Sequence, residues 1–148
     1  MAMSGYIKLV GQKQGKIKGT PKKGPFSDGI EITAFDFGLE TPFDPQSGQP
    51  TGKRKHKPIV ITREVDSASP LLWQALCTNE SFVVAQLSFA RPDGTGKSSA
   101  FQTIELTNGT IRSITHSPNS GGKRLERITF DYDLIRVNGL SDVVIHRA

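Results

Sequence analysis

The run DGTGKS at residues 93 to 98 is the most suggestive chemical motif in the sequence. A glycine-rich loop that ends in Gly-Lys-Ser can hold phosphates with its backbone amides and its lysine. The first glycine of that motif would fall at position 91, where this chain has Arg91. The residues after Ser98 alternate like a strand, whereas a phosphate-binding loop leads into a helix whose N-terminus faces the anion. We interpret the run as a turn between strands.

Histidine and cysteine residues offer no recognisable catalytic or metal-binding pattern. The chain has three histidines, His56, His116 and His146, with no i, i+4 pair among them, and a single cysteine, Cys77. Zinc sites use closely spaced His and Cys ligands, and a serine nucleophile of the hydrolase type sits in a GxSxG turn that this sequence lacks. We expect no catalytic residue, metal or cofactor. Cys77 lies in an apolar helical stretch and is predicted to be a core residue.

Two carboxylates stand two residues apart on one face of a predicted strand. Asp131 and Asp133 could in principle act as general acid and base. Three cations, Lys123, Arg124 and Arg127, precede them closely. We therefore predict a solvated or salt-bridged strand face.

Positive charge is distributed unevenly. The net charge is +5, the first 23 residues hold six lysines and no acidic residue, and residues 53 to 57 hold a second basic cluster. Such patches can bind phosphate backbones. A small β-barrel that binds single-stranded nucleic acid also needs aromatic stacking platforms, and aromatic residues are only 7% of the chain and fall mostly on inward-facing positions. Nucleic-acid binding is kept as the alternative function.

Alternation of apolar and polar residues predicts about seven strands. The clearest cover residues 6–10, 30–39, 59–65, 83–89, 104–106 and 128–134. In the second of these the apolar face changes phase near Thr33 and Ala34, which predicts a bulge or a strong twist. Asn108-Gly109 predicts a hairpin turn.

One helix is predicted between the strands. Ser69 is a good N-cap directly before Pro70, which suits the first helical position. Leu72 and Ala75 share a face with Leu76, and Asn79 is a natural stop. One helix among many strands predicts a mainly β fold, a barrel or sandwich with the helix on its flank, in a single domain covering residues 1 to 148.

Residues 40 to 56 show neither the strand nor the helix period and contain three prolines and two glycines. A structureless loop longer than about 12 to 15 residues is uncommon in a compact domain unless it is functional or disordered. The segment therefore predicts a contact with a partner; a flexible linker is the alternative. No apolar run approaches the ~20 residues of a membrane helix, and the first twenty residues lack the apolar block of a signal peptide.

Three stretches of the sequence carry a family resemblance. They are YIKLVGQKQGKIKG at residues 6 to 19, DPQSGQPTGKRKHKPIVITREVD at residues 44 to 66, and SPLLWQAL at residues 69 to 76, with LTNGTIRSI at residues 106 to 114 as a weaker fourth. Together they resemble the Hcp (haemolysin-coregulated protein) family of the type VI secretion system.

The resemblance implies a compact β-barrel of two antiparallel sheets with one flanking α-helix. It also implies a homohexameric ring with a central channel, and rings that stack into a tube. The implied partners are other copies of the chain, the spike protein at the tip of the tube, the contractile sheath that propels it, and small effector proteins in the channel. The implied location is the cytoplasm before firing and then the extracellular medium or a target cell, without a cleaved signal.

In this family the segment between the second and third strands reaches to neighbouring subunits and rings. The resemblance thus implies that residues 44 to 56 are the ring and tube interface. Its expected contributors, which include the shaping prolines and glycines and the polar side chains, are Asp44, Pro45, Gly48, Pro50, Gly52, Lys53, Arg54 and His56.

Overall fold

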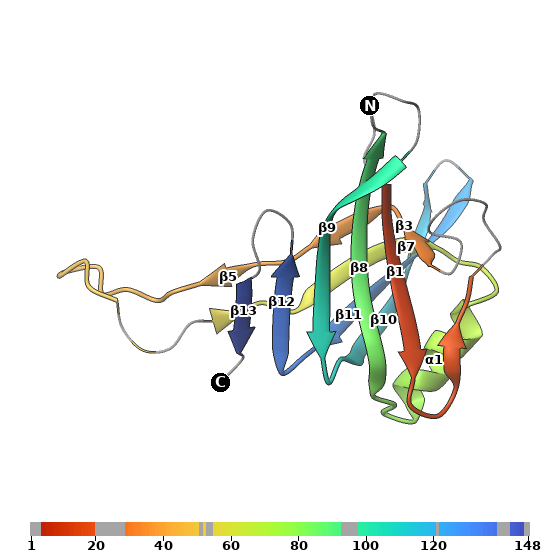
Figure 1. Ribbon diagram of the computed structural model, residues 1–148, viewed down its shortest axis with the longest axis horizontal. Coiled ribbons are helices and arrows are strands. Elements are labelled where there is room, and N and C mark those ends of the chain that lie inside the picture. Colours follow the sequence, from red (N-terminus) through yellow and green to blue (C-terminus); the bar gives the residue numbers. More distant parts are fainter. Residues whose placement is uncertain are drawn as a thin grey trace.

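The computed structural model describes residues 4–19, 29–50, 52, 55–92, 98–120, 122–138 and 143–146. Two large antiparallel sheets, one two-stranded ribbon and one helix make up these residues (Figure 1). The predicted mainly β fold of two antiparallel sheets with one flanking helix is confirmed. The described part of the chain contains no helix that is long and apolar enough to cross a membrane.

The larger sheet has seven strands in the order β13-β12-β9-β8-β1-β2, and β3 pairs with β1 at the same edge. Its strands are β1 (Ser4–Gly11), β2 (Gly15–Ile17), β3 (Ile30–Ile32), β8 (Phe82–Pro92), β9 (Ser98–Thr107), β12 (Leu134–Asn138) and β13 (Val143–His146). Three of its pairs, β1–β2, β8–β9 and β12–β13, join strands that are consecutive in sequence, whereas β1–β8, β9–β12 and β1–β3 join strands that are separated by other elements.

The second sheet has four strands in the order β10-β11-β7-β4. Its strands are β4 (Ala34–Asp36), β7 (Ile59–Glu64), β10 (Thr110–Ser120) and β11 (Lys123–Asp131). The helix α1 (Ser69–Cys77) packs against β10. The two-stranded ribbon consists of β5 (Leu39–Glu40) and β6 (Lys55–His56).

The core lies between the two sheets, because alternate side chains of each strand point inward. Ile7 and Leu87 reach it from the larger sheet, and Ile61, Ile128 and Phe130 reach it from the smaller one; all five are fully buried. Burial of each such side chain stabilises the fold by roughly 1.5 to 3 kcal/mol relative to exposure.

The phase change at Thr33 marks a crossing between the sheets. β3 pairs with β1 in the larger sheet, and β4 pairs with β7 in the smaller one. The amide of Thr33 donates to the carbonyl of Thr62 at 2.7 Å, and its hydroxyl donates to the same oxygen at 3.0 Å. The chain crosses here from one sheet to the other, and the inner faces of the two sheets oppose each other. The inward-facing positions must therefore change from even-numbered to odd-numbered residues. The predicted bulge within one strand is wrong.

Two further connections also cross between the sheets. The predicted strand at 128–134 is two strands, because β11 ends at Asp131 in the smaller sheet and β12 begins at Leu134 in the larger one. Asn108 forms a tight turn with φ of +55°, but it joins β9 to β10, which belong to different sheets. The turn is confirmed and the hairpin is not.

The helix begins one residue earlier than predicted. Ala68 precedes its first turn without a side-chain cap, and Ser69 is its first residue. The Ser69 hydroxyl is buried and occupied elsewhere, so it does not cap. The helix ends as predicted near Asn79, which has a φ of +52°. Cys77 is exposed, which contradicts the predicted core position, because the buried face of this short helix runs through Leu72 and Ala75.

Val83 begins the predicted strand at 83–89 and has the same alternation phase as Ala85 and Leu87, yet it is 67% exposed. The register between β1 and β8 explains the difference: Val10 pairs with Val84 and Gly11 pairs with Phe82, so Val83 is an extra residue in a bulge. Phe82 takes the inward place and is buried. A bulge shifts the face on which the following residues fall, and alternation alone does not reveal it.

Candidate functional site

A narrow arm, described over residues 39–50 and at residues 52, 55 and 56, projects from the body of the protein (Figure 1). Its base is the ribbon of β5 and β6, in which Leu39 pairs with His56 and Glu40 pairs with Lys55. The prediction that this segment has no secondary structure is thus partly wrong. Backbone N–H and C=O groups of a long excursion need partners, and here the two sides of the excursion supply them to each other.

The tip of the arm is a turn organised by Asp44. The amide of Asp44 donates to the carbonyl of Gln49 at 2.8 Å, and the amide of Gly48 donates to the carbonyl of Asp44 at 2.8 Å. One carboxylate oxygen accepts the Gln46 amide at 3.0 Å, and the other accepts the Ser47 hydroxyl at 3.0 Å. Gly48 has a φ of +69°, which glycine adopts readily. The tip is therefore shaped before any partner arrives.

Proline and glycine shape the rest of the arm. Pro45 enters the turn directly after Asp44, Pro50 forms an isolated bridge with Phe43, and Gly52 has a φ of +72°. Phe43 is 65% exposed. Sequence reasoning missed Phe43, although a lone aromatic residue between prolines in a polar segment was a visible signal. Lys53 and Arg54 lie outside the described residues.

The base of the arm is attached to the core through His56. Its Nδ1 and the hydroxyl of Tyr132 are joined by a hydrogen bond of 3.0 Å, and the two rings meet edge to face. Tyr132 is buried. The amide of Lys57 also donates to the carbonyl of Gly38 at 3.0 Å. The arm therefore leaves the body in a fixed direction.

An apolar pocket of about 260 Å³ opens where the two sheets approach each other. Its walls include Phe35 and Phe89, whose rings meet edge to face with centroids 5.2 Å apart. Ile32 closes its floor beside Gly5, and Thr33 and Ala34 line its rim. A Cβ at position 5 would lie 2.9 Å from Cγ1 of Ile32, so glycine leaves the room that Ile32 occupies.

A second and larger hollow of about 640 Å³ runs over β1, β8 and β9. Lys8, Gln86 and Glu105 form a row across it, since Lys8 pairs with Gln86 and Gln86 pairs with Glu105. These side chains are polar and come from the outer face of the sheet. The hollow has no nucleophile with an oriented base among its lining residues.

A buried ionic cluster joins the helix to the smaller sheet. Nη1 of Arg63 donates to Oε2 of Glu126 at 2.7 Å, and Nη2 of Arg63 contacts Asp66. The Ser69 hydroxyl donates to Glu126 at 3.0 Å. Sequence reasoning missed this cluster. Its signal was the period of two, which places Arg63 in the inward row of Ile61.

Glu80 holds the turn between β1 and β2. Its Oε2 accepts the amides of Lys13 at 2.9 Å and Gln14 at 2.8 Å. Burial raises the pKa of Glu80, but these amide donors and the nearby Lys13 charge lower it more, so the pKa lies below its ordinary value. Gly11 has no side chain here because a Cβ would overlap Oε2 of Glu80.

The residues considered for catalysis are dispersed. Pro92 pairs with Ser98 and a strand follows, as predicted, while residues 93–97 lie outside the described part. Asp131 pairs with Arg112 of the adjacent strand, a partner that the sequence reasoning did not name, and Asp133 accepts a hydrogen bond from Asn108.

The histidines stand apart from one another in the fold. His56 lies at the arm base, His116 lies on β10 with Nε2 3.5 Å from Oε1 of Glu126, and His146 lies in β13. Among the described residues no group of three His, Cys, Asp or Glu residues is placed to hold a metal ion.

Comparison with known proteins agrees with this architecture. The sequence matches the family described as "Type VI secretion system effector, Hcp" over residues 6–138. A protein named "Major exported protein" from Pseudomonas aeruginosa is 35% identical over 123 residues, which are 77% of this chain and 72% of that protein. The family match does not support the alternative of a nucleic-acid-binding barrel.

Solved structures show the same fold. A crystal structure of an Hcp protein aligns with a TM-score of 0.91 at 25% identity, covering 99% of this chain and 100% of the other. The secreted protein Hcp3 from Pseudomonas aeruginosa aligns with a TM-score of 0.81 at 23% identity, covering 99% and 100%. The chain therefore belongs to the Hcp family and is a secreted tube protein of a type VI secretion system, structural in role and not an enzyme.

Proposed function

We propose that the arm, residues 39–56, joins copies of this chain into homohexameric rings that stack into the secretion tube. The observation that carries the proposal is a shaped arm that stands away from the body and ends in an exposed Phe43 beside the Asp44 turn. A two-stranded ribbon alone is marginally stable in water. Contact with a neighbouring subunit would stabilise the ribbon further.

The attachment of the arm favours such a contact. His56 is bonded to the buried Tyr132, and the tip turn is closed by its own hydrogen bonds. Because the arm is already ordered, association loses less conformational entropy than the ordering of a flexible loop would cost. A contact between two different surfaces of one chain repeats from copy to copy, and it closes into a ring when its rotation divides the circle.

The predicted interface residues divide into two roles under this proposal. Asp44, Pro45, Gly48, Pro50 and Gly52 set the course of the arm. Lys53, Arg54 and His56 were expected to make polar contacts with neighbours; His56 also binds Tyr132 within its own chain.

The proposal extends to the wider partners of the tube. The tube would carry a spike protein at its tip, travel within a contractile sheath, and hold small effector proteins in its channel. The chain would act as a single domain of residues 1 to 148, reside in the cytoplasm before firing, and then leave the cell with the tube. Co-purification of tubes with spike and sheath proteins checks these partners.

Deletion of residues 44 to 54 tests the role of the arm. The deletion removes the tip and leaves both large sheets, so we expect circular dichroism and the thermal midpoint to stay near those of the wild type. Tube stacking, seen by negative-stain electron microscopy, should be lost. Val83→Ser, which changes an exposed apolar residue outside the arm, is the control and should stack normally. Unchanged tubes in the deletion variant would refute the proposal.

A further inference from the structure

We infer that Phe43 of one copy inserts into the apolar pocket that Phe35 and Phe89 of a second copy line. The inference rests on the proposed function and adds to it the two surfaces that meet. Its two sides lie on different parts of the chain, the tip of the arm and the junction of the two sheets.

The arm presents Phe43 as a fixed projection. Its backbone forms a bridge with Pro50, and the next residue, Asp44, begins the hydrogen-bonded turn. With 65% of its surface exposed, the ring is the main apolar group in a tip otherwise made of polar, proline and glycine residues. Scattered exposed apolar side chains are common in proteins, but an aromatic ring on a rigid projection is a typical anchor for a pocket.

The pocket has the chemistry of an aromatic ring's binding site. Phe35 and Phe89 already meet edge to face, and a third ring can extend that arrangement with further edge or face contacts. The other lining residues are Gly5, Ile32, Thr33 and Ala34, none of which carries a charge. An incoming phenylalanine therefore displaces water from apolar walls without desolvating an ion.

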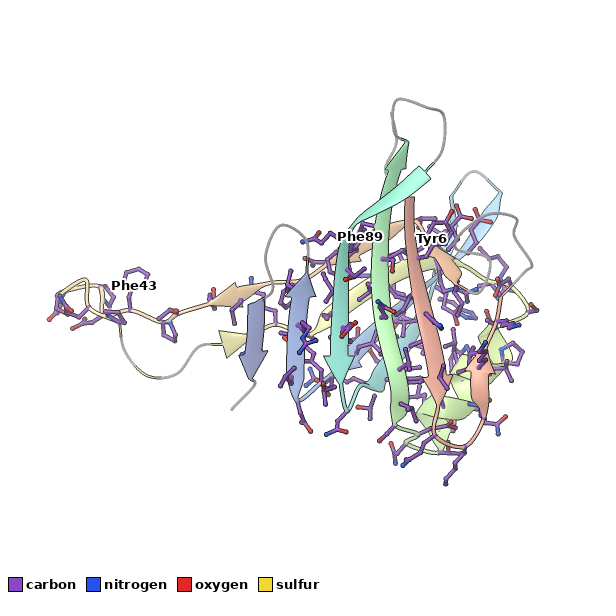
Figure 2. All side chains as sticks on the ribbon, in the orientation of Figure 1. Tyr6, Phe43 and Phe89 are labelled. Atoms are coloured by element: carbon purple, nitrogen blue, oxygen red, sulfur yellow. The ribbon has the colours of Figure 1, made fainter. Side chains whose placement is uncertain are left out.

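The pocket cannot receive Phe43 of its own chain. Figure 2 shows Phe43 near the far end of the arm and Phe89 over the body of the sheets. The β5–β6 pairing and the His56–Tyr132 bond hold the arm in its outward direction. The occupant is therefore Phe43 of another copy, and such a contact between unlike surfaces propagates from subunit to subunit.

Cysteine cross-linking tests the contact directly. In a C77S background, which removes the one native cysteine, the variant F43C/A34C places a thiol on the projection and another on the pocket rim. A short bismaleimide added to assembled protein should give a ladder of covalent multimers on a denaturing gel. The control F43C/V83C pairs the same projection with another exposed position, away from the pocket, and should give little or no ladder.

The outcomes separate this inference from the proposed function. A ladder in F43C/A34C alone supports the contact. Equal ladders in both variants, or none in F43C/A34C while rings of the expected mass persist, overturn the contact and leave ring assembly standing. Wild-type protein that remains a monomer overturns both.

A second variant series covers the case in which cysteine disturbs the contact. Phe43→Ala should weaken subunit association roughly 10- to 100-fold, as expected for the loss of one buried phenylalanine, whereas Phe43→Leu should retain part of it. Val83→Ala is the matched control for loss of an exposed apolar side chain. Association of Phe43→Ala equal to that of the wild type would contradict the inference.

Discussion

Arg63 and Glu126 lie directly opposite each other on β7 and β11, and their side chains meet at 2.7 Å where neither is more than 1% exposed. Asp66 and Ser69 complete the cluster at the start of α1. The pair therefore joins the two strands and fixes the helix against the smaller sheet.

Removal of one partner of this pair should be strongly destabilising. Arg63→Met leaves Glu126 buried without its cation, and we expect a loss of about 3 to 5 kcal/mol in the free energy of unfolding, measured with urea. The double variant Arg63→Met with Glu126→Leu should recover most of this loss, because no unpaired charge remains at the centre of the cluster.

The exposed pair Arg112–Asp131 provides the control for that experiment. Arg112→Met should cost less than about 1 kcal/mol, since solvent screens exposed pairs. If Arg63→Met cost no more than Arg112→Met, the buried pair would have no special role in the fold.

Glu80 should make stability depend on pH in the acid range. The pKa of Glu80 is lowered in the folded protein from the ordinary value of 4.5, so the unfolded chain binds a proton more readily. The stabilisation is therefore fully present above about pH 4.5 and is lost as the pH falls through the lower folded-state pKa. Urea unfolding of the wild type and of Glu80→Gln at several pH values checks this.

The difference between those two proteins should be largest near neutral pH and should shrink below pH 4.5. A difference that stayed constant from about pH 7 to pH 3 would show that the Glu80 carboxylate charge does not contribute.

Gly11→Ala should disrupt the contact between Glu80 and the β1–β2 turn. An added Cβ would overlap Oε2 of Glu80, and loss of the Lys13 and Gln14 bonds should cost about 1 to 3 kcal/mol in unfolding free energy. Combined with Glu80→Ala, the Gly11→Ala cost should fall, which a double-mutant cycle measures. Additive costs would argue against a shared contact.

Asp44→Ala should weaken assembly without weakening the folded body. The substitution removes the bonds to Gln46 and Ser47 that order the tip, worth about 1 kcal/mol each. The thermal midpoint should stay within the error of the wild type, because the turn is remote from the core, while tube length and number in electron micrographs fall. A shifted thermal midpoint together with normal tubes would contradict this role of Asp44.

Cys77→Ser should change stability by no more than about 0.5 kcal/mol, because Cys77 is exposed. A maleimide reagent should label Cys77 in the folded monomer at close to the rate seen in denaturant. If labelling required unfolding, Cys77 would be buried in the core, as the sequence predicts.

The strands and the helix could be predicted because they rely on local alternation and period. Ile7 with Leu9, and Ile59 with Ile61, fall inward as the pattern indicates. The assignment of strands to sheets could not be predicted, because a phase change at Thr33 looks the same whether the strand bulges or the chain crosses to the other sheet. The bulge at Val83 could not be predicted for a similar reason, because local alternation does not reveal an extra residue in a strand.

The length of the segment and its prolines were enough to locate the candidate site in the sequence, but they did not predict its shape. Composition places an excursion at residues 40 to 56, and only the structure pairs Leu39 with His56 and turns the excursion into an arm. Phe43 escaped notice because hydrophobic pattern analysis assigns single aromatic residues to the core. Its position between Pro42 and Pro45 in a polar segment was the local signal that indicated exposure instead.

The native mass of the purified wild-type protein, measured by light scattering over a concentration series, is the most direct test of ring formation. Six copies of 16.1 kDa correspond to about 97 kDa, and the account predicts a species of that mass that appears as a ring in negative stain. A species that remains at 16.1 kDa at every concentration would contradict it.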